Sequence, residues 1–227
     1  MNDSLKYKAA VAALDEVTDG MAVGLGTGST VTHFIRELGN RVRDGLKVTA
    51  IATSSQSETL ALEVGIPIVT FQDQKELDLT VDGADEVSPE LNLVKGLGGA
   101  LVREKIVAAA SRRLVIVVDD SKLVDQLGTR SPVSVEVVPF AADIVMHQLG
   151  AIGGQPRLRV MESGRPFVSD NGNFVVDWHF GPILDPPMVE RRLKSLSGVV
   201  DSGIFSDLAD RVIVARGTGL EILDRQP

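Results

Sequence analysis

The sequence contains no cysteine, which excludes disulfide bonds, thiolate nucleophiles and zinc sites with sulfur ligands. Histidine is almost as scarce: His33, His147 and His179 are far apart and show no spacing typical of metal ligands. No apolar run approaches the ~20 residues that a membrane-spanning helix needs, and the N-terminal stretch MNDSLKYKAA lacks the apolar segment of a signal peptide. We therefore expect a cytoplasmic protein with no metal ion and no membrane partner.

Positively charged residues are also fewer than negatively charged ones. Lysine and arginine number 23 against 31 aspartates and glutamates, a formal net charge of −8. This balance argues against a broad nucleic-acid-binding surface, although a local positive site can still bind a small anion. The chain has 227 residues, 44% of them hydrophobic, which is enough for one large globular domain or two small ones.

The first part of the chain alternates between apolar runs and amphipathic stretches. Strands are predicted over 21–25, 48–53, 66–70, 77–81 and 114–118, and helices over 4–17, 29–38, 58–64 and 99–110. Such alternation is typical of an α/β fold: a Rossmann-like, mostly parallel sheet with helices on both faces.

The pattern changes near residue 131. Strands are predicted over 133–138, 157–161 and 167–178, with a DNGN turn at 170–173, and helices over 140–149 and 188–196. The run RVIVA at 211–215 is predicted to return to the first sheet. We therefore expect a Rossmann-like catalytic domain over 1–130 and 207–227, and a smaller inserted α+β domain over 131–206 with a possible role in oligomerisation.

The first glycine loop, GLGTGST at 24–30, lies between a predicted strand and a predicted helix. Backbone N–H groups at a helix start favour an anion, and Thr27, Ser29 and Thr30 add hydroxyl donors. A dinucleotide fingerprint is disfavoured because the spacing is G-x-G-x-G and no carboxylate ends the next strand; a P-loop is disfavoured because the loop has no lysine. A plain turn or a site for the phosphate of a small substrate remains.

The run TSSQSE at 53–58 follows the next predicted strand. Its hydroxyls are predicted to lie at the same carboxyl edge of the sheet, where open α/β sheets bind ligands. The alternative is a helix cap, with Ser55 and Glu58 at the spacing of a capping box, and for Glu58 we prefer it.

Charged residues gather after the later strands. Asp82 and Asp85 share the turn DGAD, Lys95 precedes a second glycine loop, KGLGG at 95–99, and Glu104 falls in the first turns of a predicted helix. Lys122 follows another strand. Each has an ordinary alternative as a turn residue, a helix-start acid or a surface lysine. Burial of Glu104 near the sheet edge would raise its pKa and suit it to act as a general base.

Taken together, these residues indicate carboxylate acid–base chemistry on a phosphorylated substrate. Glu86, beside the DGAD turn, is expected to be a flanking surface charge. The residues alone do not identify the substrate.

The segments GLGTGST, TSSQSE, DGADEV, KGLGGALVREK and DDSK, in this order, resemble the ribose-5-phosphate isomerase A family, as do DNGNFVVDWHF, ILDPPMVE and GVVDSGIF further on. The resemblance covers essentially the whole chain. It implies reversible conversion of D-ribose 5-phosphate to D-ribulose 5-phosphate in the non-oxidative pentose phosphate pathway, without metal or organic cofactor. It also implies a homodimer or homotetramer.

The resemblance further implies roles for individual residues. Glu104 matches the family's proton acceptor, working through a cis-enediolate, with Lys95 stabilising the enediolate oxygens. We assign proton transfer among hydroxyls to Asp82, and the holding of a hydroxyl or of Lys95 to Asp85. The substrate-binding residues carried over are Thr27, Gly28, Ser29, Thr30, Asp82, Gly83, Ala84, Asp85, Lys95, Gly96, Leu97, Gly98 and Lys122. Leu97 is a departure, since the family commonly has glycine there.

Three alternatives stay open. Another phosphosugar or acyl-transfer enzyme on the same scaffold would share the first glycine loop, but DGADEV and ALVREK disfavour it. A sugar-phosphate sensor would not need Asp82, Lys95 and Glu104, and would normally carry a basic nucleic-acid-binding segment, which is not seen. A nicotinamide-dependent dehydrogenase is disfavoured by the missing ribose carboxylate.

Overall fold

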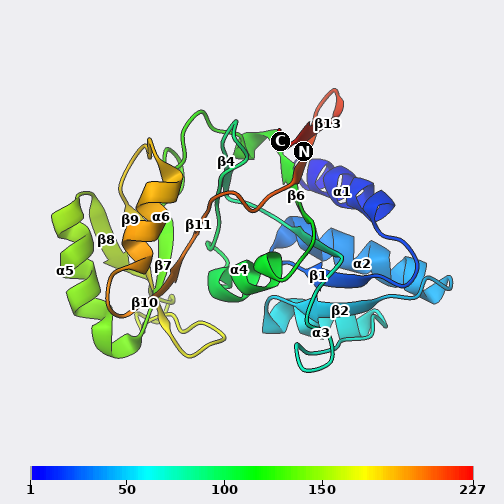
Figure 1. Cartoon of the computed structure of the whole chain (residues 1–227), viewed down its shortest axis with the longest axis horizontal. Coiled ribbons are helices and arrows are strands. Elements are labelled where there is room, and N and C mark those ends of the chain that lie inside the picture. The colour runs from blue at the N-terminus through cyan, green and yellow to red at the C-terminus, as the bar shows by residue number, and fades with distance from the viewer. Residues whose placement is uncertain (1, 227) are drawn as a thin grey trace. The chain divides into compact units, whose positions relative to one another are not determined.

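The computed structural model describes residues 2–226, which divide into two compact units (Figure 1). The first unit comprises the chain up to Ala84, the segment Arg103–Lys122 and the chain from Leu208 onward. The second comprises Asp85–Val102 and Leu123–Asp207. Each unit has its own sheet and its own hydrophobic core.

The first unit is built on a six-stranded sheet of order β13-β12-β6-β3-β1-β2. The strands are β1 (Ala22–Leu25), β2 (Thr49–Ala52), β3 (Leu79–Asp82), β6 (Leu114–Asp119), β12 (Arg211–Arg216) and β13 (Gly219–Asp224). All neighbours are parallel except β12 and β13. The predicted return of 211–215 to this sheet is confirmed, because β12 pairs in parallel with β6.

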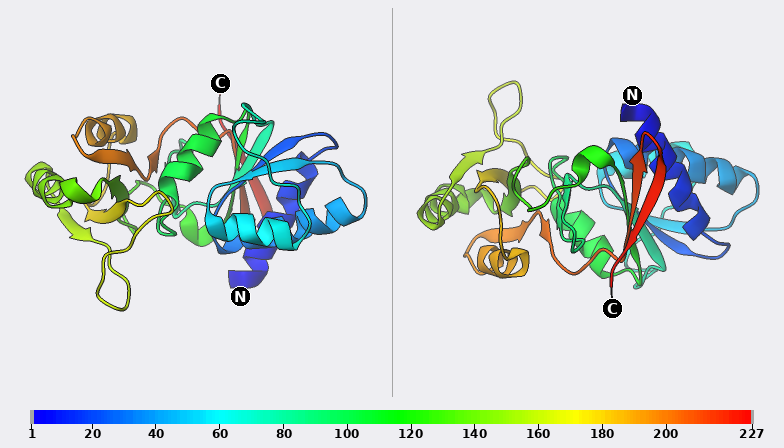
Figure 2. Two further views of the ribbon diagram at one scale, coloured as in Figure 1. Left: turned by 90° about the horizontal axis from the view of Figure 1, so that it is seen from below. Right: turned by 90° about the horizontal axis from the view of Figure 1, so that it is seen from above.

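Alternating side chains in these strands build a core on each face of the sheet. Val23 and Leu25 face the larger core with α1 (Asn2–Ala13), α2 (Ser29–Arg43) and α3 (Ser55–Glu63). Ala22 faces the opposite core together with Val107 of α4 (Leu101–Ala109). Figure 2 shows α1 running along β6 and β12, with α2 packed beside it. The predicted mostly parallel sheet with helices on both faces is therefore confirmed.

The second unit contains an antiparallel sheet of order β10-β7-β9-β8 and a small sheet of order β11-β5-β4. The strands are β4 (Glu86–Val87), β5 (Leu93–Val94), β7 (Val133–Val137), β8 (Gln155–Leu158), β9 (Phe174–His179), β10 (Val199–Ser202) and β11 (Ile204–Phe205). Helices α5 (Ala142–Ile152) and α6 (Pro186–Lys194) complete it, and Trp178 of β9 is fully buried in its core. Short 3₁₀ turns lie at Leu14–Glu16 and Asp120–Lys122 in the first unit and at Pro139–Ala141 in the second.

Two predicted strands are corrected. Residues 66–70 form no strand, and only an isolated bridge joins Ile68 to Ala50; Pro67 in this segment has no N–H to donate to a ladder. The strand predicted over 167–178 begins only at Phe174, because the DNGN turn interrupts the segment before it.

The limits of the second unit also differ from the predicted inserted domain. The prediction began that domain at residue 131, whereas the compact unit also takes in Asp85–Val102. The reason is long-range pairing: β5 pairs with β11 about a hundred residues later in the chain, as in Leu93↔Phe205. Strands of two residues leave no periodic signal in the sequence.

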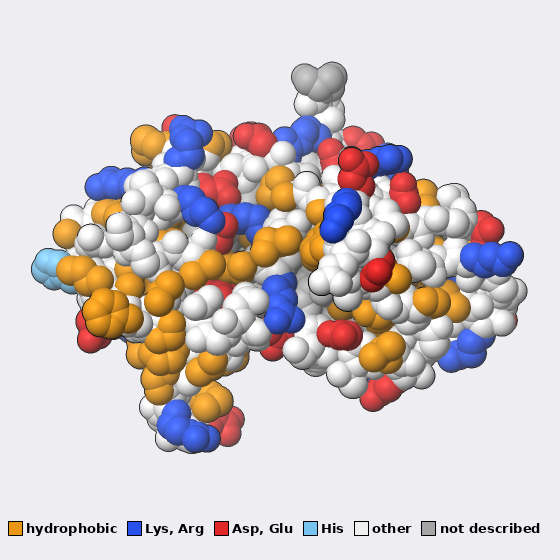
Figure 3. All heavy atoms as spheres, turned by 60° about the horizontal axis from the view of Figure 1, so that its bottom comes forward, with side chains coloured by type: hydrophobic (Ala, Val, Ile, Leu, Met, Phe, Trp, Pro, Cys, Tyr) orange, Lys and Arg blue, Asp and Glu red, His pale blue; other side chains and the backbone are white. Residues whose placement is uncertain are grey.

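The surface shows no large patch of one charge on the face drawn in Figure 3, where lysine and arginine side chains are interspersed with acidic ones. In the part of the chain that the structure describes, every helix is too short or too polar to cross a membrane.

Glu86 corrects another prediction, because it is not a surface charge. Its side chain is fully buried, and its carboxylate accepts hydrogen bonds from the backbone N–H groups of Gly128, Arg130 and Ser131, each at 2.6 Å. Three donors compensate the cost of burying the charge. Glu86 thus fixes the loop that leads into β7.

We expect Glu86→Ala to destabilise the second unit by about 3 kcal/mol, because three N–H groups lose their acceptor. Residue-resolved amide exchange is the sharpest measurement: Gly128, Arg130 and Ser131 should lose protection. Glu90→Ala, at an exposed glutamate four residues on, is the matched control and should leave these amides unchanged. Unchanged protection in Glu86→Ala would contradict the anchoring role.

Gly26 lies where β1 ends beside β3, and its N–H donates to Val81 O at 2.9 Å. A Cβ atom built on Gly26 would lie 2.1 Å from Oδ1 of Asp82 and 2.6 Å from its Cα. A new side-chain rotamer of Asp82 therefore cannot relieve the clash, since the backbone itself is too close. Glycine at this position permits the two strand ends to approach.

We expect Gly26→Ala to lower the free energy of unfolding by about 3 kcal/mol, the upper part of the range for overpacked sites. Gly83→Ala is the control in the same turn, because its Cβ would meet nothing nearer than Thr27 O at 3.9 Å. Denaturant unfolding of both variants checks the difference. Equal stabilities of the two variants would show that the strand ends yield to the extra carbon.

Candidate active site

The first glycine loop leads from β1 into α2 and leaves the start of that helix open. Gly28 is the N-cap residue, with φ +118°, and carries no side chain that could cap the helix. Gly28 and Ser29 are exposed, while Thr30 is partly buried. Backbone N–H groups at such a helix start, with the helix dipole, favour an anion.

The hydroxyl groups of the TSSQSE run meet this loop, as predicted. The Thr27 hydroxyl lies 2.7 Å from Thr53 Oγ1 and 2.8 Å from Ser54 Oγ, and the Ser57 hydroxyl donates to Gly26 O at 2.6 Å. The predicted capping box is wrong by one residue. Ser54, not Ser55, is the N-cap of α3, and its Oγ accepts from Ser57 N at 3.1 Å. The cluster therefore joins two helix starts.

A lysine that the sequence did not single out also reaches this loop. Lys6 of α1 donates from Nζ to Ser29 Oγ at 2.9 Å. A cavity of about 390 Å³ opens beside it, lined by Asp3, Gly28, Ser29, Thr32, His33, Arg36 and Gln56. No motif marks Lys6, because it lies 23 residues before its partner on a different helix.

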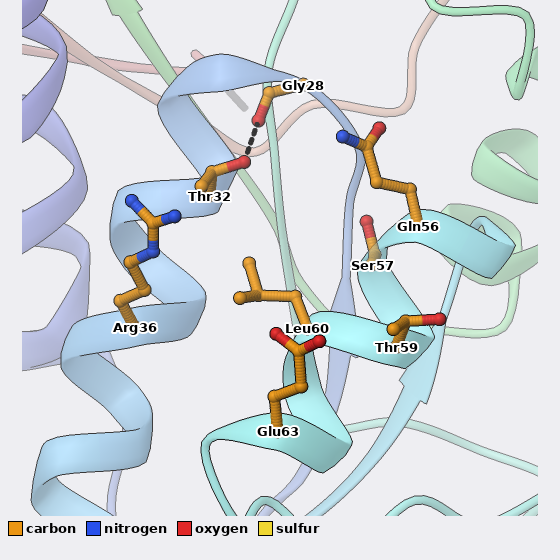
Figure 4. Close-up of a pocket in the computed structure, with 8 residues that line it drawn as sticks. All are labelled: Gly28, Thr32, Arg36, Gln56, Ser57, Thr59, Leu60 and Glu63. Atoms are coloured by element: carbon orange, nitrogen blue, oxygen red, sulfur yellow. Dashed lines mark hydrogen bonds between the residues drawn. The ribbon is translucent and has the colours of Figure 1, made fainter.

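A second cavity of about 340 Å³ lies between α2 and α3 and adjoins the first, with which it shares Gly28, Thr32, Arg36 and Gln56 (Figure 4). Figure 4 shows Arg36 on α2 and Glu63 on α3 flanking it, with the Thr32 hydroxyl donating to Gly28 O at 3.2 Å. Lys6 and Arg36 thus supply positive charge near the start of α2, while Asp3 and Glu63 supply negative charge at the two cavities.

Asp82 connects the DGAD turn to the first glycine loop. Only 1% of the residue is exposed, and its Oδ1 accepts from Thr27 N at 3.1 Å and from Gly83 N at 2.7 Å. Asp82, Gly83 and Thr27 therefore lie together at one edge of the sheet. Ala84 is the last residue of this segment of the first unit.

Glu104 and Lys122 also belong to the first unit. Glu104 lies in the first turn of α4 and is 4% exposed, so the burial expected for it is present. Its position places the carboxylate at the positive end of the helix dipole. Lys122 ends the 3₁₀ turn that follows β6 and is partly buried.

Asp85 and Lys95 belong to the second unit, so the two aspartates of the DGAD turn are divided between the units. Oδ2 of Asp85 accepts from Leu97 N at 3.0 Å, which is a contact with the second glycine loop rather than with Lys95 itself. Lys95 is 3% exposed; its N–H donates to Gly203 O at 2.8 Å, and its Nζ lies 5.7 Å from the centre of the Phe205 ring. Lys95 is therefore held by both its backbone and its side chain.

The second glycine loop requires glycine at two positions but not at residue 97. Gly96 has φ +106° and Gly99 φ +81°, and a Cβ on either would collide with Ser134 at 2.9 Å or Phe167 at 2.4 Å. Leu97 is outside the positive-φ region and its side chain is half-exposed. Leucine therefore fits this loop without backbone strain.

A second residue that the sequence missed, Arg159, also contacts this loop. Its Nη1 donates to Gly96 O at 3.0 Å and to Leu97 O at 3.1 Å. Among residues 2–226, the structure places no three His, Asp or Glu side chains together as metal ligands.

The chain resembles known proteins in both sequence and structure. The family model for ribose 5-phosphate isomerase A (phosphoriboisomerase A) matches residues 49–219. A curated protein of Thermomicrobium roseum named ribose-5-phosphate isomerase A is 50% identical over 221 residues, covering 97% of this chain and 93% of that protein.

Solved structures agree over the full length. A D-ribose-5-phosphate isomerase in complex with phospho-erythronic acid superimposes with a TM-score of 0.97 at 40% identity, covering 99% of this chain and all of that one. Ribose 5-phosphate isomerase A of Methanocaldococcus jannaschii gives a TM-score of 0.94 at 42% identity, with the same coverage. The chain therefore belongs to the ribose 5-phosphate isomerase A family.

Proposed function

We propose that this protein interconverts D-ribose 5-phosphate and D-ribulose 5-phosphate, a step of the non-oxidative pentose phosphate pathway. The observation that carries the proposal is the full-length match to proteins named ribose-5-phosphate isomerase A, with three ionisable side chains buried at the family's site positions. Asp82, Lys95 and Glu104 are exposed by only 1%, 3% and 4%. Charged side chains are rarely buried so completely without a partner or a function that requires them.

The substrate phosphate binds at the first glycine loop. The backbone N–H groups and hydroxyls at the start of α2, from Gly28, Ser29 and Thr30, donate to its oxygens. Lys6 adds a positive charge beside Ser29, and a charge-assisted hydrogen bond to phosphate is stronger than a neutral one. Lys122 is assigned to substrate binding through its family position.

Glu104 is the general base. It removes the proton from C2 of the open-chain aldose, and the electrons of the C–H bond form the C1–C2 double bond of a cis-enediolate. Glu104 then returns the proton to C1, and C2 becomes the ketone carbon. Lys95 stabilises the negative enediolate oxygens, Asp82 transfers protons among hydroxyls and assists ring opening, and Asp85 orients the second glycine loop.

This reaction exchanges oxidation state between two carbons of one molecule, so electrons balance without a redox cofactor. We accordingly propose that no organic cofactor or metal takes part. A sensor domain would need phosphate binding but no buried acid–base set, and the relatives named as isomerases do not favour it. Another phosphosugar enzyme on this scaffold is disfavoured for the same reason.

We further propose a cytoplasmic homodimer or homotetramer that assembles through the second unit. The absence of cysteine supports a reducing compartment. Exposed apolar side chains on the second unit support self-association, with Phe140 fully exposed and Leu184 exposed by 84%.

Glu104→Gln should reduce kcat for ribose 5-phosphate by about 10³-fold, since the amide cannot accept the C2 proton. Ketopentose formation is measured with a chelator present, for the wild type and for Glu162→Gln as an exposed control. Near-normal turnover in Glu104→Gln would remove Glu104 as the base. Wild-type activity that vanishes with the chelator and returns with added metal would refute the metal-free reaction.

Lys6→Met should raise KM for ribose 5-phosphate by about 10- to 100-fold, the effect of losing one hydrogen bond to a charged group. The inhibition constant of inorganic phosphate should rise in parallel. Lys8→Met, two residues along the same helix and exposed, is the matched control and should change neither constant. Unchanged KM and phosphate inhibition in Lys6→Met would place the phosphate elsewhere.

A further inference from the structure

Arg159 follows β8, and all five N–H groups of its guanidinium have acceptors. Its Nε donates to Asp177 Oδ2 at 2.9 Å, and its Nη2 donates to Asp177 Oδ1 at 2.5 Å and to Ser134 Oγ at 2.9 Å. The two N–H groups of Nη1 reach the carbonyl oxygens of Gly96 and Leu97. A surface arginine would not normally have so complete a set.

The sheet of the second unit explains why these side chains meet. Ser134 on β7 lies opposite Asp177 on β9, and the Ser134 hydroxyl donates to Asp177 Oδ1 at 3.1 Å. Arg157 on β8 lies opposite Asp177 on its other side, so Arg159, two residues further, projects from the same face. Its backbone is fixed as well, because its N–H donates to Val175 O at 2.8 Å.

The second glycine loop is held from both sides of one peptide group. Arg159 binds the carbonyl of Gly96, and Asp85 binds the N–H of Leu97 in the same peptide. In a trans peptide these two groups point in opposite directions, so the pair of contacts fixes the orientation of the peptide plane. In the next peptide group, Arg159 binds the carbonyl of Leu97. The N–H of the exposed Gly98 belongs to the same peptide group and therefore points away from the guanidinium.

Packing adds to this constraint. Phe167 contacts the position of Gly99, and the Arg159 guanidinium lies 5.6 Å from the centre of the Phe167 ring. The side chains of Arg159 and Asp177 are only 13% and 19% exposed. Since a mostly buried ion pair contributes little net stability compared with apolar packing, its use here indicates a geometric role.

We propose that Arg159, oriented by Asp177 and Ser134, is a positioning residue for the isomerase reaction: it aligns the second glycine loop so that Lys95 and the N–H of Gly98 face the developing enediolate. The inference rests on the proposed isomerase function. Arg159 does not touch the substrate; it acts through the peptide groups of residues 96–98. Leucine at residue 97 is compatible with this arrangement, because Arg159 and Asp85 use only its backbone.

Arg159→Met should lower kcat by about 10²-fold, the effect expected for a small displacement of catalytic groups, and leave KM within about threefold. The inhibition constant of inorganic phosphate should not change, because phosphate binds at the first glycine loop. Arg159→Lys should recover only a minor part of kcat, since an ammonium group has three donors and no planar fork. Arg157→Met, two residues earlier on β8 and exposed, should behave as wild type.

Chemical rescue separates positioning from general stability. Adding guanidinium ion at millimolar concentration to Arg159→Ala should restore part of kcat, whereas methylammonium should not, because only the planar ion can bridge the carboxylate and the two carbonyls. If Arg159→Ala does not fold, Asp177→Asn takes its place: it should lower kcat with KM nearly unchanged, and Asp170→Asn in the turn before β9 should not.

Near-normal kcat in a folded Arg159→Met, beside an active wild type, would overturn this inference alone. An equal loss in kcat and in phosphate affinity would also overturn it, since that pattern indicates general damage. A wild type without isomerase activity would overturn the proposed function and this inference with it.

Discussion

The carboxylate of Asp82 is the contact on which the first glycine loop depends. It ends β3 and accepts the N–H groups of Thr27 and Gly83, so two turns from neighbouring parallel strands share one acceptor. The contact is possible only because Gly26 has no side chain. The buried carboxylate of Asp82 and the absence of a side chain at Gly26 therefore fix the loop that leads to the start of α2, where we propose that the phosphate binds.

Buried carboxylates serve different purposes in this protein, and burial alone does not identify a catalytic one. Glu86 accepts three backbone N–H groups. Glu136 on β7 accepts Ser169 Oγ, Asn171 Nδ2 and Asn173 Nδ2 at 2.9, 3.0 and 2.9 Å, which closes the turn before β9. These partners fix loops of the second unit. Glu104 differs in its place at the start of a helix, where we propose that it acts as the general base.

We propose that both glycine loops present backbone N–H groups to the substrate. The first presents N–H groups at a helix start to an anion, with Lys6 beside them. In the second, Arg159 binds the carbonyl oxygens of Gly96 and Leu97 and Asp85 binds the Leu97 N–H, which leaves the Gly98 N–H for the substrate that we propose. Both arrangements supply fixed dipoles that need little rearrangement as negative charge develops, which is the physical basis of electrostatic catalysis.

The sequence by itself determined the α/β class, the order of most elements and the candidate residues, because periodicity and glycine spacing are local properties. It also placed the hydroxyls of 53–57 beside the first glycine loop, since parallel strands end at one edge. Tertiary structure alone decided the rest. Glu86 is buried, 85–102 packs with the second unit, and Lys6 and Arg159 reach the two loops. Each of these depends on partners far away in the chain, and pairing across such separations leaves no local pattern.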